Sequence, residues 1–323
     1  MASIFPLLWK IKSRNIWGEN MKKALITGAN GFLGSLLTAR LLNAGVEVIA
    51  ADMPGQNDRI PQGAYFAAFN MRDFSTLKMA VGQRDIDIMF HMAWSGSFGA
   101  ARADYALQSD NIKYTCDAVR TAAEMGIGRF VGAGTLAQMD CLAYIGDNGS
   151  APSDVSCYGT AKIAAQYMSK ATANVMGIDH IWCFISNTYG IGNTTMNFVN
   201  FASKKMLAGE RASFTAAEQN YDFVYIDDTI NGLYLCGKKG RPNFSYYIGS
   251  GAARKLKDYI MLIRDAVDPG IKLHFGEIPF NGKSLPKEAF DCLQIEKDTG
   301  YHAVTPFEDG IVKTINWIKE LNK

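Results

Sequence analysis

A tyrosine and a lysine four positions apart form the chemically most suggestive pair in this chain. Tyr158 and Lys162 lie on one face if the surrounding segment is helical. A free tyrosine has a pKa of about 10, and a nearby ammonium group lowers that pKa because it favours the phenolate. Such a tyrosine can take a proton from a hydroxyl group or return one to a ketone. The alternative interpretation is an ordinary pair on a helix surface.

A threonine upstream is a candidate partner of the phenol. The run 129–135 reads as a strand that ends in small residues, with Thr135 as its last member. Its hydroxyl group could hydrogen-bond the reacting oxygen of a substrate and orient it. The alternative is a threonine that merely ends a strand in a turn.

A glycine-rich turn near the start of the chain could bind a diphosphate. Residues 22–27 read as a short buried strand, and leucines at helical period follow Gly28, Gly31 and Gly34. The first glycine permits a tight turn, the second lets the backbone approach a pyrophosphate, and the third allows the helix to pack closely on the sheet. The N-terminus of the helix supplies free N–H groups to the phosphates. The turn and the tyrosine pair together indicate hydride transfer between a nicotinamide and an alcohol or ketone.

A carboxylate follows the glycine turn at about the distance at which such proteins bind the adenosine ribose. The second predicted strand, 46–51, ends at Asp52, and an acid about 20 residues beyond the turn can hold a ribose 2′-hydroxyl. A carboxylate there repels a 2′-phosphate, so Asp52 favours NAD as the cofactor, with NADP as the alternative.

These motifs occur in an order that resembles the extended short-chain dehydrogenase/reductase family. Within it, the chain is similar to the NAD-dependent epimerases and dehydratases of nucleotide sugars. The resemblance runs from Met21 to Trp317 and includes a TGxxGxxG turn at 27–34 and a segment at 221–228 similar to RDFVxVxD.

The resemblance implies a set of site residues. Thr135, Tyr158 and Lys162 would be catalytic, and Lys162 would also hold the nicotinamide ribose. Ser95, Thr135 and Asn187 would contact substrate. The cofactor would be bound by Gly28, Asn30, Gly31, Phe32, Leu33, Gly34, Asp52, Asn70, Met71, Met92, Ala93, Trp94, Asn111, Tyr158 and Lys162.

Three departures from the family pattern bear on the substrate. Leu136 and Ala137 stand where the 4,6-dehydratases carry an Asp-Glu pair, so water elimination has no obvious catalyst there. Tyr221 replaces an arginine, and a tyrosine cannot grip phosphate with a bidentate fork. Ala133 and Gly134, in place of two serines, would enlarge the site.

The predicted fold class is α/β. Strand-like and helical runs alternate to about residue 185, which is typical of a Rossmann-type, doubly wound parallel sheet. We expect residues 21–189 to form a dinucleotide-binding domain, to which the chain returns at about 221–250. Most of 190–323 would form a smaller α+β substrate lobe. Residues 1–20 would be an N-terminal arm or extension.

Composition limits the partners and the compartment. The chain has 323 residues, 48% of them hydrophobic and 20% charged, and a net charge of +2, which gives no broad field for nucleic acid. No apolar run reaches about 18 residues, so we expect no membrane span. Six scattered cysteines and four histidines argue against a metal site and suit a reducing cytoplasm. The resemblance implies a homodimer through the helices after Asn111 and Tyr158.

The leading hypothesis is a nucleotide-sugar epimerase or ketoreductase that uses NAD(P), with Tyr158 as acid and base. One alternative is an NADPH-dependent reductase of a non-nucleotide ketone or aldehyde, which Tyr221 favours. The other is a dinucleotide-sensing protein without turnover, which the presence of both Tyr158 and Lys162 disfavours.

Overall fold

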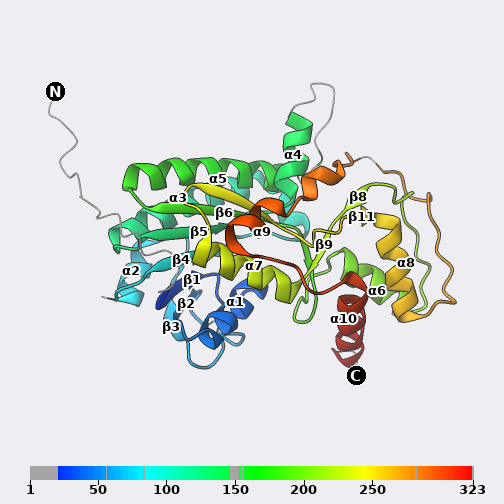
Figure 1. The fold of residues 1–323 in the computed structure, drawn as a ribbon, viewed down its shortest axis with the longest axis horizontal. Helices are drawn as coiled ribbons and strands as arrows, with labels where there is room; N and C mark the ends of the chain where they lie inside the picture. The colour runs from blue at the N-terminus through cyan, green and yellow to red at the C-terminus, as the bar shows by residue number, and fades with distance from the viewer. Residues whose placement is uncertain are drawn as a thin grey trace.

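Seven parallel strands form the central sheet, in the order β10-β6-β5-β4-β1-β2-β3 (Figure 1). The strands are β1 (Lys23–Thr27), β2 (Glu47–Asp52), β3 (Tyr65–Ala68), β4 (Ile88–His91), β5 (Arg129–Ala133), β6 (Asp179–Ile185) and β10 (Phe244–Ile248). The predicted doubly wound sheet is confirmed. Chain order reverses between β1 and β4, and ligands of open α/β sheets bind at such a reversal, beyond the carboxyl ends of the strands.

The computed structural model describes residues 21–55, 57–82, 84–145, 153, 156–280 and 282–321. The expected N-terminal arm at 1–20 lies outside these residues. Within the part of the chain described, no helix is both long and apolar enough to cross a membrane.

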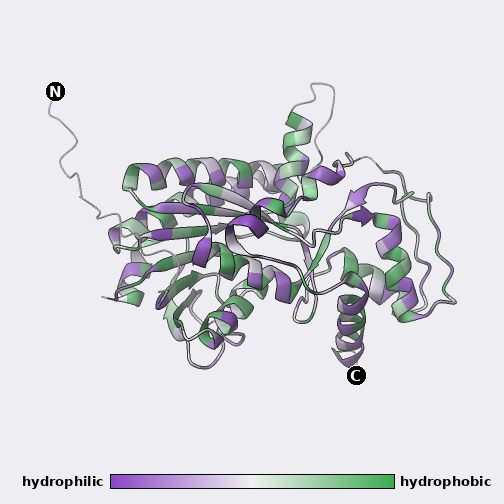
Figure 2. Cartoon of the chain, viewed as in Figure 1, coloured by the Kyte–Doolittle hydropathy of each residue, from purple (hydrophilic) through white to green (hydrophobic). Residues whose placement is uncertain are grey.

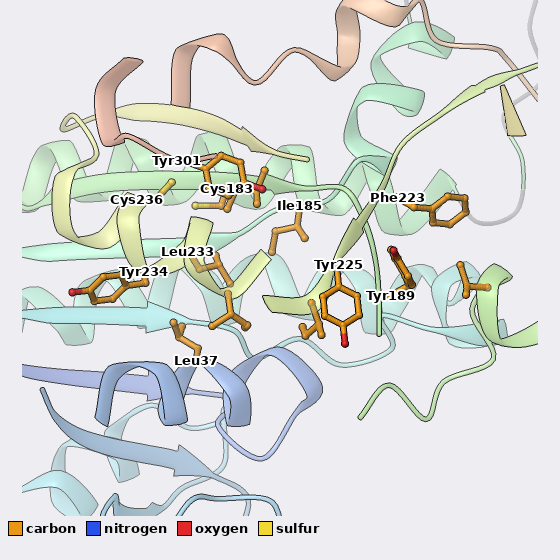
Figure 3. Packing of buried hydrophobic residues seen from close by; sticks show 14 of the residues in the cluster. Leu37, Cys183, Ile185, Tyr189, Phe223, Tyr225, Leu233, Tyr234, Cys236 and Tyr301 are labelled. Atoms are coloured by element: carbon orange, nitrogen blue, oxygen red, sulfur yellow. The ribbon is translucent and has the colours of Figure 1, made fainter. Parts of the chain in front are cut away.

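Helices cover both faces of the sheet because its strands are apolar on both sides. On β1, Ala24 and Ile26 belong to the core beneath α1 (Phe32–Asn43) and α7 (Ile226–Lys239). Figure 3 shows Leu37 of α1 and Leu233 of α7 in this core. Leu25 points the other way, into a second core. The helices of that face are α2 (Ser75–Val81), α3 (Tyr105–Glu124) and α5 (Ser156–Met176).

A smaller lobe lies beyond the carboxyl ends of the strands. Its helices are α6 (Phe198–Leu207), α8 (Leu256–Val267) and α10 (Phe307–Leu321), and α8 packs against both others. Figure 2 shows hydrophilic and hydrophobic residues alternating along α8 and α10, as expected of helices with one buried face. Two short strand pairs complete the lobe: β7 (Asn187–Tyr189) with β9 (Phe223–Tyr225), and β8 (Asn220–Tyr221) with β11 (Arg254–Lys255).

Aromatic side chains join this lobe to the sheet. Phe223 of β9 lies 4.9 Å from Tyr259 of α8, measured between ring centroids, and Tyr259 lies 4.7 Å from Phe307 of α10. Phe307 also contacts Tyr189 of β7, at 4.9 Å. All four rings are buried, so the joint is an apolar cluster that fixes the lobe over the ends of the strands.

Three of the remaining short elements border the cleft between sheet and lobe: η1 (Gly99–Ala103), α4 (Ala137–Ile145) and η2 (Lys287–Phe290). The fourth, α9 (Leu293–Thr299), packs against α7 and β10. Sequence periodicity did not predict η1 or α4, and both contribute side chains to the site.

Candidate active site

A cavity of about 760 Å³ opens at the carboxyl ends of the central strands. It brings together the glycine turn after β1, the end of β2, the loop after β4 and the first turn of α5. The predicted cofactor residues that line it are Gly28, Asn30, Gly31, Phe32, Leu33, Gly34, Asp52, Asn70, Met71, Met92, Ala93, Trp94, Tyr158 and Lys162. Ser95 and Thr135, predicted to contact substrate, line it as well.

The glycine turn leaves room only for backbone. Gly28 has φ +73°, and a Cβ there would lie 2.6 Å from the backbone N of Ala93. A Cβ on Gly34 would overlap the carbonyl oxygen of Gly28. Gly31 caps α1 without any side-chain hydrogen bond, so the first N–H groups of the helix are open to the cavity. This backbone cradle fits a dinucleotide pyrophosphate.

Asp52 stands at the end of β2 with both carboxylate oxygens already oriented. Its Oδ2 accepts a hydrogen bond from the backbone N of Asn30 at 2.7 Å, and its Oδ1 accepts one from Met53 N at 2.8 Å. The Asn30 side chain donates to Asp58 at 2.8 Å. Two carboxylates therefore flank Asn30, which adds to the negative charge expected to repel a 2′-phosphate.

Tyr158 is buried at the inner end of the cavity and faces a cation that the sequence analysis missed. The guanidinium of Arg102, in η1, lies over the phenol ring, 4.6 Å from its centroid. The Trp94 ring meets the phenol edge-on, with centroids 6.0 Å apart. Burial raises the pKa of Tyr158, whereas the charge of Arg102 and a hydrogen bond with Thr135 lower it.

Lys162 lies on the cofactor side of the tyrosine. Its Nζ donates to the carbonyl of Ala133 at 2.6 Å and stands 3.7 Å from the centroid of the Trp94 ring. Burial lowers the pKa of Lys162 to about 7. The spacing of the pair predicts that Lys162 lowers the pKa of Tyr158, whereas in the structure the positive charge that lowers it is that of Arg102.

A buried amide network positions Thr135. The backbone N of Thr135 and the indole of Trp182 both donate to Oε1 of Gln138, at 3.0 and 3.1 Å. Gln138 in turn donates to Gln166 at 2.9 Å. A Cβ on Gly134 would overlap Trp182 and Gln138. Gly134 thus makes room for this network, and it also lines the first cavity.

Asn111 does not line the cavity, although the resemblance placed it among the cofactor residues. Its side chain is buried, accepts from the backbone N of Ser95 and donates to the carbonyls of Ser95 and Leu107, each at 2.9 Å. The acceptor oxygen and the donor NH2 group of the amide are therefore both occupied by backbone groups. Asn111 therefore holds the loop that carries Trp94 and Ser95.

A second cavity, of about 490 Å³, continues from the first on the side of the smaller lobe. Thr135 and Tyr158 line both cavities, so they stand at the junction. Asn187 and Tyr221 line the second cavity, and Nδ2 of Asn187 donates to the carbonyl of Asp222 at 3.1 Å. Burial raises the pKa of Tyr221 to about 12, so it is a neutral phenol at physiological pH.

Asp140, on α4, is a further residue of the second cavity that the sequence analysis missed. It follows Leu136 by one helical turn, and burial raises its pKa to about 6, against an opposing effect of Arg102. No sequence signal marked it, because only the helical turn of α4 directs it into the cavity.

The fold and the site together are those of a dinucleotide-dependent enzyme, with a second cavity next to the first. Residues 24–249 match the model of the NAD dependent epimerase/dehydratase family, and the chain belongs to this family. It is thus an NAD-dependent enzyme of the epimerase/dehydratase type.

Similar proteins act on different nucleotide sugars. A probable dTDP-glucose 4,6-dehydratase of Sinorhizobium fredii is 23% identical over 92% of this chain and 93% of its own. UDP-glucuronic acid decarboxylase 1 of Xenopus tropicalis is 24% identical over 94% of this chain and 73% of its own.

Solved structures share the fold. UDP-glucose 4-epimerase of Thermotoga maritima has a TM-score of 0.76 at 20% identity and covers 93% of this chain and 100% of its own. The Bordetella bronchiseptica enzyme WbmF in complex with NAD+ has a TM-score of 0.74 at 21% identity, with 93% of each chain covered.

We predict that replacing Asp140 with Asn stabilises the protein in a pH-dependent way. The carboxyl pKa is higher in the folded state, at about 6, than the ordinary value of 3.8, so burial of the ionised form opposes folding above pH 6. At pH 8, Asp140→Asn should raise the free energy of unfolding by on the order of 1–2 kcal/mol. The difference should shrink as pH falls through 6 and vanish below about pH 4. Urea unfolding at several pH values measures this, and a pH-independent difference would contradict it.

Proposed function

We propose that this protein is a nucleotide-sugar epimerase or ketoreductase that transfers a hydride at a sugar carbinol. The observation that carries the proposal is the position of Tyr158 and Thr135 at the junction of two cavities. One cavity has the backbone cradle and the acid that suit NAD. The other is lined by polar side chains of the smaller lobe and can take a sugar.

In the proposed reaction Tyr158 moves the proton. NAD, when bound in the first cavity, accepts or returns the hydride at its nicotinamide ring. As the carbinol carbon loses its hydrogen with the electron pair, the phenolate of Tyr158 takes the hydroxyl proton, and the substrate becomes a ketone. Thr135 donates a hydrogen bond to the same oxygen and fixes its direction. In the reverse step, Tyr158 returns the proton.

The remaining groups support these steps. Lys162 is held between the Ala133 carbonyl and Trp94, where it can donate to a ribose hydroxyl. Arg102 favours the phenolate, which is the form needed to accept a proton. Binding of substrate in the second cavity would exclude water from the phenol.

Asp140 gives a specific reason to consider dehydration as a second candidate. The pair Leu136 and Ala137 provides no acid or base, but Asp140 supplies a carboxyl group to the same cavity one helical turn later. A carboxylate there could remove a proton from a carbon next to the ketone, a step that precedes loss of water.

The central prediction concerns Tyr158→Phe. Without the phenol hydroxyl, turnover should fall roughly a hundred- to ten-thousandfold, while NAD affinity stays within about twofold because the ring and Lys162 remain. Mass spectrometry of products from a panel of nucleotide sugars measures turnover and also identifies the reaction. An epimer keeps the substrate mass, a reduced or oxidised sugar changes it by two hydrogens, and a dehydrated sugar loses water. Unchanged turnover in the variant would refute the role of Tyr158 and leave a sensor-like protein.

Cofactor preference should depend on Asp52. Asp52→Asn keeps an oxygen to accept from Asn30 N but removes the charge that repels a 2′-phosphate. We expect NADP affinity to rise on the order of tenfold and NAD affinity to change little. Calorimetric titration with both nucleotides tests this. Tighter NADP than NAD binding by the unaltered protein would instead support an NADPH-dependent reductase.

We further propose a homodimer through the outer faces of α3 and α5. These helices lie side by side, and Tyr105, Tyr167, Met168 and Val175 are between 54% and 77% exposed on them. The double substitution Met168→Glu and Val175→Glu should convert a dimer to a monomer in sedimentation experiments. Val304→Glu, at an equally exposed site outside these helices, is the matched control. A monomeric unaltered protein would end this proposal.

A further inference from the structure

Arg102 brings a positive charge into the substrate cavity next to the reacting group. It lies at the end of η1, and the planar guanidinium rests on the face of Tyr158, 4.6 Å from the ring centroid. The same side chain lines the second cavity with Tyr221 and Asp140. The contact with the Tyr158 ring restricts the orientation of the guanidinium, so its donors have a defined direction.

The hydrogen-bonding capacity of Arg102 is not used within the described chain. Its Nε is shielded from solvent and has no hydrogen-bond partner, and the guanidinium makes no ion pair with any described residue. A shielded donor of a charged group is costly to leave unpaired. A side chain kept in this state beside a cavity therefore points to a partner that binds in the cavity.

The surroundings of Arg102 indicate that this partner is an anion. Arg102 lowers the pKa of Asp140, Tyr221 and Tyr158, so its charge reaches all three groups, yet none of them forms an ion pair with it. Tyr221 stands where the resemblance expects a phosphate-binding arginine and supplies no charge. Arginine is suited to oxyanions because its fork of N–H groups matches the geometry of carboxylate and phosphate.

We propose that Arg102 binds an oxyanion of the substrate, either a carboxylate on the sugar or a phosphate of the nucleotide. This inference rests on the proposed nucleotide-sugar function and specifies how the substrate is held where Tyr221 cannot hold it. Asp140 should weaken binding of the oxyanion, because its carboxylate places a negative charge in the same cavity.

Calorimetric titration of the NAD-loaded protein with UDP-glucose, UDP-glucuronate and inorganic phosphate tests the proposal. In Arg102→Met, which keeps the length of the side chain without its charge, we expect a ten- to hundredfold loss of affinity. Equal losses for both nucleotide sugars assign the site to phosphate. A loss confined to UDP-glucuronate assigns it to the sugar carboxylate.

In the matched variant Asp140→Asn, affinity for the same ligand should rise several-fold. Unchanged affinities in Arg102→Met overturn the proposal.

A second readout separates this proposal from the proposed function. The shielded Nε–H of Arg102 should give a distinct ¹⁵N-arginine NMR signal, assigned by its disappearance in Arg102→Met. A shift of this signal on titration with phosphate supports the oxyanion site even if neither nucleotide sugar binds, in which case the proposed function alone fails. A signal unmoved by phosphate and by both nucleotide sugars rules the oxyanion site out. An Arg102→Met variant with undiminished thermal stability and NAD affinity shows that folding is not the cause of its loss of affinity.

Discussion

The hydrogen bond from Lys162 to the carbonyl of Ala133 joins the elements on which the site depends. The ammonium group extends from α5 to the end of β5 at 2.6 Å and is covered by Trp94 from the loop after β4. Tyr158 lies one turn before Lys162 on α5, and Thr135 lies two residues after Ala133. This contact joins the helix that carries the phenol to the strand end that precedes Thr135. Burial lowers the pKa of Lys162 to about 7, so the carbonyl and the indole face offset only part of the hydration that the ammonium loses.

The electrostatics of the two cavities differ in kind. The cofactor cavity is polar through backbone groups at the start of α1 and through Asp52, all of which have partners or face the expected pyrophosphate. The second cavity instead contains two charged or ionisable side chains, Arg102 and Asp140, that are near each other without forming an ion pair. Unpaired groups of this type destabilise a fold and are concentrated at functional sites. The second cavity therefore has the character of a site completed by its ligand.

The parts of the site predicted from the sequence are those set by local structure. The glycine turn, Asp52 and the pair Tyr158 and Lys162 each depend on one strand end or one helical turn, so spacing alone places them. Arg102 and Asp140 come from η1 and α4, short helices that sequence periodicity did not predict, and only tertiary packing brings them to Tyr158. Asn111 shows a further limit, since a resemblance identifies a residue that matters but not whether it contacts the ligand or supports the loop that does.

Most strands of the sheet were predictable for the same reason. The last strand, β10, was not, because its position depends on a partner far away in the sequence. The apolar runs of β1, β2, β4, β5 and β6 were recognisable, whereas the short edge strand β3, which is largely exposed, was not predicted. Strand β10 is separated from its partner β6 by most of the elements of the smaller lobe. The smaller lobe is accordingly inserted, in part, within the sheet domain, and the aromatic cluster that joins the two includes Phe307 near the end of the chain. During synthesis on the ribosome, an incomplete chain can form the cofactor cradle but must leave the edge of β6 and the apolar face awaiting Phe307 uncovered. Such nascent chains are the species most exposed to aggregation and most in need of a chaperone.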